Sequence, residues 1–297
     1  MKIKVGDVKG CKKIDKIKYI NNALIIDNRV YKKKSNKEIY NYLEAKDFHH
    51  YLEPIRTKKG IDEFIFIKEP QIDNNDKAID LIYILSYLQN KTTSYEDINL
   101  DKVKEKFESI NQEIISLRDY YYQMQDKVER KVYFNPGEHL LMCNISIIYE
   151  DLNKAKLAID KYYEIVTKKE KVRKVFTHGK LELDHFLDNE DKRLISFKKL
   201  EKDLPIYDFI HFYKTHYNEV DMIDLFNIYQ SRFAYSEEEL MLLFAEILLM
   251  DKVEITDNSY FTYEKVQNLI EYVQIAKDFV LKQNEKYKEN KKKELQE

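Results

Sequence analysis

Hydrophobic residues are spaced differently on the two sides of residue 76. Before it, short apolar runs separated by polar turn residues predict β-strands, while residues 36–51 carry apolar side chains at helical spacing. Asp27 and Asn28 lie between the first two runs and predict a tight hairpin turn. Pro70 ends the third strand, and the polar residues 71–76 predict a linker. The predicted strands are residues 23–26, 29–31 and 64–67.

After residue 76 the apolar positions recur at helical spacing, which predicts amphipathic helices. Asn135 is a suitable cap for one of them, with Pro136 at its first position. Between residues 175 and 195, short apolar pieces separated by polar turns predict small strands instead. The predicted helices are residues 78–88, 103–128, 136–149 and 152–166, with further helices from residue 207.

This pattern predicts an α+β chain of two unequal parts. Residues 1–75 form a small N-terminal α+β lobe, and residues 76–285 form a larger, mainly helical C-terminal lobe. Residues 286–297 form a charged tail. The 297 residues are enough for two lobes with a sizeable core.

Composition and charge exclude several classes of function. The net charge of −2 gives no overall basic excess, so neither nucleic acid nor an anionic membrane is expected as a partner. Cys11 and Cys143 lie far apart, which predicts a reducing compartment without a disulfide or a zinc site. Residues 1–13 lack the apolar segment of a signal peptide, and residues 240–250 are too few to span a bilayer. We therefore expect a cytoplasmic protein.

Three short segments in the second half of the chain carry the most chemical information. Residues 176–187 read Phe-Thr-His-Gly-Lys-Leu-Glu-Leu-Asp-His-Phe-Leu, residues 194–198 read Leu-Ile-Ser-Phe-Lys, and residues 203–210 read Asp-Leu-Pro-Ile-Tyr-Asp-Phe-Ile. This order resembles the aminoglycoside phosphotransferase and choline kinase family. There the catalytic loop reads His-Gly-Asp, four residues and Asn, followed by Ile-Asp-Phe and Pro-x-Tyr-Asp-Leu.

The resemblance extends beyond the loop. Residues 84–92 are similar to a family helix that ends in Leu-His-x-x-Thr. Residues 135–141 are similar to the Ser-Pro-x-Glu segment of the CotS-type spore coat proteins of endospore-forming bacteria. The similarity touches most of residues 20–220, although only the loop region is specific. It implies a bacterial protein with a bilobal, protein-kinase-like fold: a small antiparallel-sheet lobe and a larger, mainly helical lobe.

The departures from the family pattern fall at its catalytic positions. Lys180 replaces the Asp that accepts the proton of the substrate hydroxyl, and a lysine has no acceptor lone pair at neutral pH. His185 replaces the Asn that binds the second magnesium, and Ser196 replaces the Asp of Ile-Asp-Phe that bridges magnesium to the phosphates. These are poor ligands for magnesium, which prefers carboxylate oxygens. The sequence therefore predicts no catalytic residue and no metal site, with His178, Lys180, His185 and Ser196 as vestigial positions.

The sequence signals for a nucleotide-binding site are also weak. By position, Lys32 or Lys33 corresponds to the strand lysine that contacts phosphates in the family, with Glu44 on the following helix as its partner. The alternative is that these lysines only lie at the exposed end of a strand and have no binding role. The hairpin turn before them has no glycine, so we do not expect this turn to close tightly over the phosphates of a nucleotide. The resemblance also implies that His178 and Gly179 shape the loop and that Asp208 braces it.

Other interpretations of the loop are weaker. His178 and His185 with Asp184 and Asp188 have no recognised metal-ligand spacing. Glu182 or Asp184 could replace the missing base, and Lys180 could hold an anion such as an ATP phosphate without metal.

Three hypotheses for the function remain. The first is a kinase-like pseudoenzyme that lacks phosphotransferase activity and acts as a binding or assembly protein, with the spore coat as its best-matched context. The second is an active ATP-dependent phosphotransferase or nucleotidyl transferase with an altered site. The third is a helical interaction protein whose kinase likeness is accidental, which the lack of a five-stranded small lobe would favour. The first predicts protein partners and no required cofactor, and the sequence identifies no small-molecule substrate.

Overall fold

The computed structural model describes residues 17–20, 23–26, 29–33, 37–68, 71–197, 201–256 and 258–294. The predicted turn at Asp27 and Asn28 and the strand end at Pro70 lie outside these residues. The chain divides into two compact units, each built from two stretches. Unit 1 comprises Met1–Thr93 and Val175–Asp203, and unit 2 comprises Ser94–Lys174 and Leu204–Glu297. This division by contacts differs from the predicted one at residue 76, because the predicted helix of residues 78–88 and the loop region both belong to unit 1.

Unit 1 contains a five-stranded antiparallel sheet in the order β1-β2-β3-β5-β4. Its strands are β1 (Ile17–Ile20), β2 (Ala23–Ile26), β3 (Arg29–Lys33), β4 (Arg56–Lys58) and β5 (Ile61–Ile65). Leu24, Ile26 and Tyr31 form its buried apolar face, and Ile61 packs against them. Lys59 and Gly60, between β4 and β5, both have positive φ (51° and 76°), as a type I′ hairpin turn requires. The pairing of β2 with β3 confirms the two strands of the predicted hairpin, and the predicted small antiparallel sheet is confirmed. The third strand was predicted over residues 64–67, but β5 begins directly after Gly60 and ends at Ile65.

The remaining elements of unit 1 position the loop. They are α1 (Lys37–Ala45), α2 (Asn74–Thr92), the last two residues of β7 (Lys171–Phe176), the 3-10 helix η2 (Leu183–His185), β8 (Phe186–Leu187), β9 (Arg193–Leu194) and β10 (Lys202–Asp203). The predicted helix over residues 36–51 is too long, because Asp47 adopts a positive φ of 56° just after α1. The predicted linker is shortened, because the Asp73 carboxylate accepts the N–H of Asn75 and caps α2.

Unit 2 is mainly helical. Its helices are α3 (Leu100–Glu129), α4 (Pro136–Val166), α5 (Ile206–His216), α6 (Met222–Arg232), α7 (Glu237–Ile247) and α8 (Ser259–Glu294), and β6 (Ser94–Asp97) pairs with residues 171–174 of β7. The two helices predicted over residues 136–149 and 152–166 are one helix, because no Gly or Pro interrupts the apolar spacing between them. The predicted cap is confirmed, since Asn135 and Glu138 form a capping box. The charged residues 286–294 continue α8.

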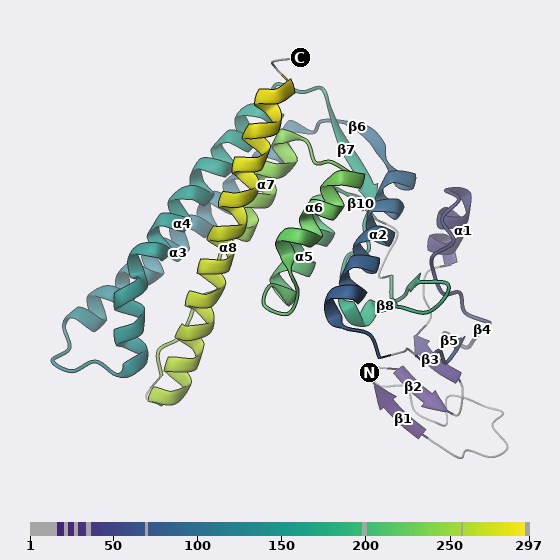
Figure 1. Ribbon diagram of the computed structural model, residues 1–297, viewed down its shortest axis with the longest axis horizontal. Helices are drawn as coiled ribbons and strands as arrows, with labels where there is room; N and C mark the ends of the chain where they lie inside the picture. The colour runs from purple at the N-terminus through teal and green to yellow at the C-terminus, as the bar shows by residue number, and fades with distance from the viewer. Residues whose placement is uncertain are drawn as a thin grey trace. The chain divides into compact units, whose positions relative to one another are not determined.

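Helix α4 is the central support of unit 2. It packs against α3, α7 and α8, and Figure 1 shows α3, α4 and α8 lying alongside one another. Its buried face carries large apolar side chains: Leu141, Ile145, Ile148, Leu152, Ile159 and Tyr162. None of the helices within the described ranges is long and apolar enough to cross a membrane.

The first turns of α4 and α8 are in close contact. A Cβ added to Gly137 would lie 2.8 Å from backbone atoms of Thr262 and Tyr263. We expect Gly137→Ala to lower the free energy of unfolding by about 1–2 kcal/mol, because overpacking outweighs the gain in helix propensity. Ser146→Ala, at an exposed position of the same helix, is the control and should change it by less than about 0.5 kcal/mol. Equal denaturation midpoints for the two variants would contradict the predicted clash.

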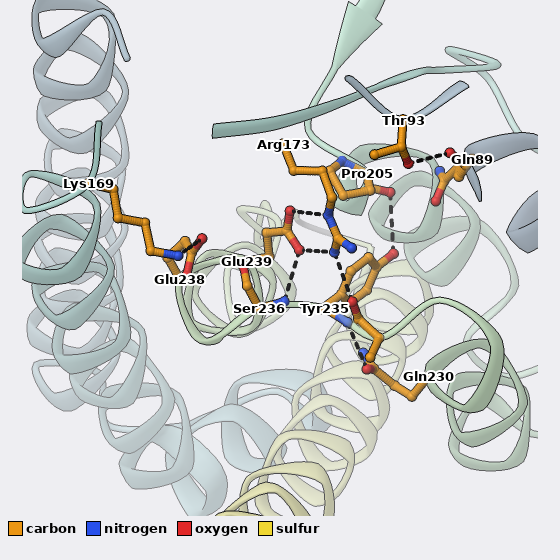
Figure 2. A network of polar contacts seen from close by, with 11 residues as sticks. Gln89, Thr93, Lys169, Arg173, Pro205, Gln230, Tyr235, Ser236, Glu238 and Glu239 are labelled. Atoms are coloured by element: carbon orange, nitrogen blue, oxygen red, sulfur yellow. Dashed lines mark hydrogen bonds and ion pairs between the residues drawn. The ribbon is translucent and has the colours of Figure 1, made fainter. Parts of the chain in front are cut away.

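A buried polar network joins β7 to the start of α7 within unit 2 (Figure 2). The Arg173 guanidinium donates to the Glu239 carboxylate, with Nε 3.1 Å from Oε1, and Nη2 donates to the carbonyl of Ala234 at 2.9 Å. The same carboxylate accepts the backbone N–H of Ser236 and caps α7. Tyr235 donates its hydroxyl to the Pro205 carbonyl at 3.3 Å. The network fixes the segment between α6 and α7.

Candidate functional site

The loop after β7 leaves the strand from a fixed point in unit 1. The backbone N–H of Phe176 donates to the Thr92 hydroxyl at 3.1 Å, and that of Thr177 donates to the Glu201 carbonyl at 3.2 Å. Thr92 is buried at the end of α2, where its hydroxyl donates to the Leu88 carbonyl at 2.8 Å. These contacts fix the position of the backbone at the start of the loop.

His178 connects this loop to the segment that contains Ser196. Its side chain is 1% exposed, its Nε2–H donates to the Ile195 carbonyl at 2.8 Å, and its ring centroid lies 4.9 Å from that of Phe197. The next residue, Gly179, has a φ of +80°, which favours glycine, and no atom lies within 4 Å of an added Cβ. The loop is therefore anchored at His178 and open beside Gly179.

Lys180, which the resemblance aligns with a catalytic Asp, forms an ion pair inside the loop. Its Nζ lies 2.9 Å from Oε1 of Glu182, and its carbonyl accepts a hydrogen bond from Nδ1 of His185 at 2.7 Å. Burial lowers the pKa of His185, against the hydrogen bond to the Lys180 carbonyl and the charge of Glu182, which raise it. The positive charges of Lys180 and Lys32 act in the same direction as burial. This part of the site therefore favours a neutral imidazole, and the Lys180 ammonium is paired with a carboxylate.

Lys32 and Ser196 are 164 positions apart in the sequence and are in direct contact. The Lys32 ammonium donates to the Ser196 hydroxyl at 2.8 Å. Burial lowers the pKa of Lys32, since its charge is partly removed from water. Ser196 has a φ of 69°, which is uncommon for a residue other than glycine. The contact brings together the lysine and the metal-ligand position that the resemblance singles out.

The structure separates the two candidate strand lysines. Lys33 is exposed at the end of β3, where its backbone is opposite Ile61, while Lys32 is half-buried and reaches Ser196. Glu44 is exposed on α1 and lines a shallow pocket of about 410 Å³ together with Tyr51. Across the described part of unit 1, no ion pair joins Lys32 to Glu44. Lys32 is hydrogen-bonded to Ser196 instead, and the nucleotide-binding role of Lys32 and Glu44 stays a prediction.

The residues at the positions that the resemblance assigns to the catalytic base and the metal ligands do not fit magnesium. Lys180 brings a positive charge, the Nδ1 of His185 donates its proton to a carbonyl, and the oxygen of Ser196 accepts from an ammonium. Magnesium takes hard oxygen ligands, preferably carboxylates. Within the described ranges, no three His, Cys, Asp or Glu side chains are grouped so that they could hold a metal ion. Asp184 is exposed and Asp188 is buried.

Some features of the site region could not be read from the sequence. The backbone N–H of Leu194 donates to the carbonyl of His50 at 2.9 Å, and the imidazole Nδ1 of His50 lies 3.0 Å from the carbonyl of Lys192. Lys192 also forms an ion pair with Asp80 at 2.5 Å. These contacts join residues more than 100 positions apart, and no local motif marks them. Asp208 is buried in α5 of unit 2, and its bracing role stays a prediction.

The fold has known counterparts among solved structures. An aminoglycoside phosphotransferase from Alicyclobacillus acidocaldarius is similar with a TM-score of 0.66 at 12% identity, covering 93% of each chain. A glucosamine kinase is similar with a TM-score of 0.48 at 10% identity, covering 97% of this chain and 80% of its own. Choline kinase LicA from Streptococcus pneumoniae is similar with a TM-score of 0.41 at 12% identity, covering 95% of each chain. No family model matches the sequence, and no curated protein matches it. The first likeness shows that this chain shares its overall fold with that structure.

Proposed function

We propose that this chain, built on the fold of an aminoglycoside phosphotransferase, does not transfer phosphate and works as a binding or assembly protein. The observation that carries this proposal is the hydrogen bond from Lys32 to Ser196. By resemblance, position 196 holds the magnesium-binding Asp in active relatives. A hydroxyl brings no negative charge to that position, and its oxygen already accepts a hydrogen bond from a cation.

The missing base supports the same proposal. An ammonium group has three donors and no acceptor, so Lys180 cannot take the proton of a substrate hydroxyl. The neighbouring carboxylate of Glu182 is engaged by Lys180 at 2.9 Å. Losing the base and the metal ligand together should reduce the rate of phosphoryl transfer by several orders of magnitude.

We further propose the bacterial spore coat as the context and other proteins as the partners. This part rests on the resemblance of residues 135–141 to the coat-protein segment. In the structure those residues form the capping box and first turn of α4, so they also have a structural role. Immunoprecipitation from sporulating and vegetative cells of the source organism tests this context, since a coat role requires enrichment in the spore fraction.

The test of the lost metal site compares melting temperatures in ATP with and without magnesium. We expect the wild-type protein to show no magnesium-dependent difference, because no carboxylate stands at position 180 or 196. In the double variant Lys180→Asp, Ser196→Asp we expect a magnesium-dependent stabilisation of about 1–3 kcal/mol at saturating nucleotide. Lys180→Asn, Ser196→Asn is the matched control, since it has the same shape without the charge.

A direct activity measurement decides between this proposal and an active enzyme with an altered site. Transfer of phosphate from Mg-ATP to any hydroxyl acceptor by the wild-type protein, abolished by Ser196→Ala, would overturn the proposal. Transfer that survives Ser196→Ala and co-purifies with this chain would overturn it as well, and only transfer that separates from the chain on further purification is assigned to a contaminating kinase.

A further inference from the structure

Six large apolar side chains are exposed at one end of unit 2. Tyr133, in the turn between α3 and α4, is 88% exposed, and Tyr260, at the start of α8, is 71% exposed. The two segments are neighbours, because Gly137 on α4 approaches the backbone of Thr262 and Tyr263. Exposed apolar groups gathered in this way mark interaction sites. We call this set the aromatic tip: Val132, Tyr133, Phe134, Tyr260, Phe261 and Tyr263.

A cavity of about 400 Å³ adjoins the aromatic tip. One face of α3 forms its first wall, from Tyr120 to Val128. Lys131 after the end of α3, Glu138 and residues 254–256 form the rest. Met124 and Val128 are buried and give the cavity an apolar floor. Lys131 is followed directly by the exposed residues of the turn. Exposed aromatic side chains and a cavity large enough to hold an aromatic side chain therefore lie on adjoining surfaces of the same unit.

The rim of the cavity carries one cation and one anion that are available to a partner. Lys131 is already paired with Glu138, which is 1% exposed. Lys127 and Glu254 also line the cavity and have exposed side chains, and neither forms an ion pair with another residue that the structure describes. Because the rim carries one unpaired charge of each sign, two copies of it are complementary in charge.

We propose that the aromatic tip and its cavity bind a second copy of this chain in a twofold symmetric dimer. In such a dimer the same surface is used by both copies, so it must offer both the inserted group and its receptor. Tyr133 of one protomer enters the cavity of its partner, and Lys127 of one protomer pairs with the partner's Glu254. Homodimer interfaces are enriched in aromatic and apolar residues, as this surface is. An anionic membrane fits less well, because the rim has no net positive charge.

Sedimentation equilibrium of the full-length protein tests the proposal. We expect a dimer at about 100 μM, a concentration at which even a micromolar dissociation constant gives a dimer. Tyr133→Ser should raise the dissociation constant at least about tenfold, since a buried aromatic anchor is removed. Tyr122→Ser is the matched control, because Tyr122 is 66% exposed on α3 and does not line the cavity. Circular dichroism confirms that both variants are folded.

Exchanging the charges of Lys127 and Glu254 tests whether this surface forms the dimer interface. Lys127→Glu and Glu254→Lys should each weaken the dimer, because like charges then face each other, and the double variant should restore it. An equimolar mixture of the two single variants should form heterodimers, since every facing pair is again opposite in sign. A wild-type monomer at this concentration overturns the proposal, as does a dimer that none of these substitutions changes. Binding of the wild-type monomer to vesicles of anionic phospholipid, lost in Tyr133→Ser, would assign the tip to a membrane and also overturn it.

Discussion

Replacing Arg173 with alanine is expected to lower the free energy of unfolding by about 3–5 kcal/mol. The side chains of Arg173 and Glu239 are 18% and 3% exposed, so the substitution leaves a buried carboxylate without its cation. The guanidinium also lies over the ring of Phe233, with Cζ 4.2 Å from the centroid, and donates to the Ala234 carbonyl. One side chain therefore holds the segment between α6 and α7 and the cap of α7, as Figure 2 shows.

Chemical denaturation of the full chain, followed by the helical circular dichroism signal, measures this effect. Arg130→Ala is the matched control. Its side chain is 76% exposed and pairs with Asp126 four positions earlier, so its loss should cost less than about 0.5 kcal/mol. Similar denaturation midpoints for the two variants would show that the ion pair of Arg173 contributes no more than a surface pair.

Replacing Asp151 with asparagine is expected to raise stability by about 3 kcal/mol at pH 8 relative to its effect at pH 4. Asp151 is 1% exposed on α4, and neither of its carboxylate oxygens accepts a hydrogen bond from the described residues. Its closest cation, Nζ of Lys154, is 3.9 Å away. Burial raises the pKa of Asp151 to about 7, although Lys154 and Lys277 lower it in part. Glu150 and Asp278 act in the same direction as burial.

The direction of this pH dependence follows from proton binding. In the unfolded chain the Asp carboxyl has a pKa of about 4. Between about pH 4 and pH 7 the folded state holds the proton of Asp151 more tightly than the unfolded state, so stability falls as the pH rises through this window. Above about pH 7 the charged carboxylate is buried in the folded state, and the full penalty applies. The asparagine variant has no carboxyl group at this position, so this pH-dependent contribution to stability is absent from it.

The measurement is the difference in unfolding free energy between the wild-type protein and Asp151→Asn from pH 4 to pH 8, in which the other carboxylates cancel. Asp160→Asn is the control on the same helix. Asp160 is 45% exposed and paired with Lys156 at 2.5 Å, so its profile should stay nearly parallel to that of the wild type. A difference for Asp151→Asn that is independent of pH would mean that the carboxylate is hydrated.

Local chemistry in the sequence was enough to predict much of the fold. The first two strand runs, the capping box at Asn135 and the helical spacing after residue 76 are local signals, and the structure confirms each of them. The third strand was predicted over residues 64–67, whereas β5 covers Ile61–Ile65. The errors were at element ends. The helix after β3 stops at Ala45, because Asp47 adopts a left-handed backbone conformation that its sequence does not announce. Helix α4 continues past residue 150, because nothing in that region breaks a helix.

The candidate site was only partly predictable. The loop positions came from a short motif, whereas the hydrogen bond between Lys32 and Ser196 joins residues 164 positions apart and depends on tertiary structure. The network of Arg173 and Glu239 was missed for a related reason, since both residues are charged and charged residues are usually expected at the surface. Their burial becomes visible only when β7 and α7 are placed side by side.

The left-handed backbone at Ser196 bears on how readily the site could change over generations. Aspartate and asparagine adopt this conformation more easily than most other residues, because their short polar side chains bond to the local backbone. The backbone at position 196 is therefore one that an aspartate side chain also suits. On the function proposed above, the missing metal ligand is then a difference of one side chain and not of the backbone around it. We expect the loop backbone of a Ser196→Asp variant to keep the wild-type conformation at this position.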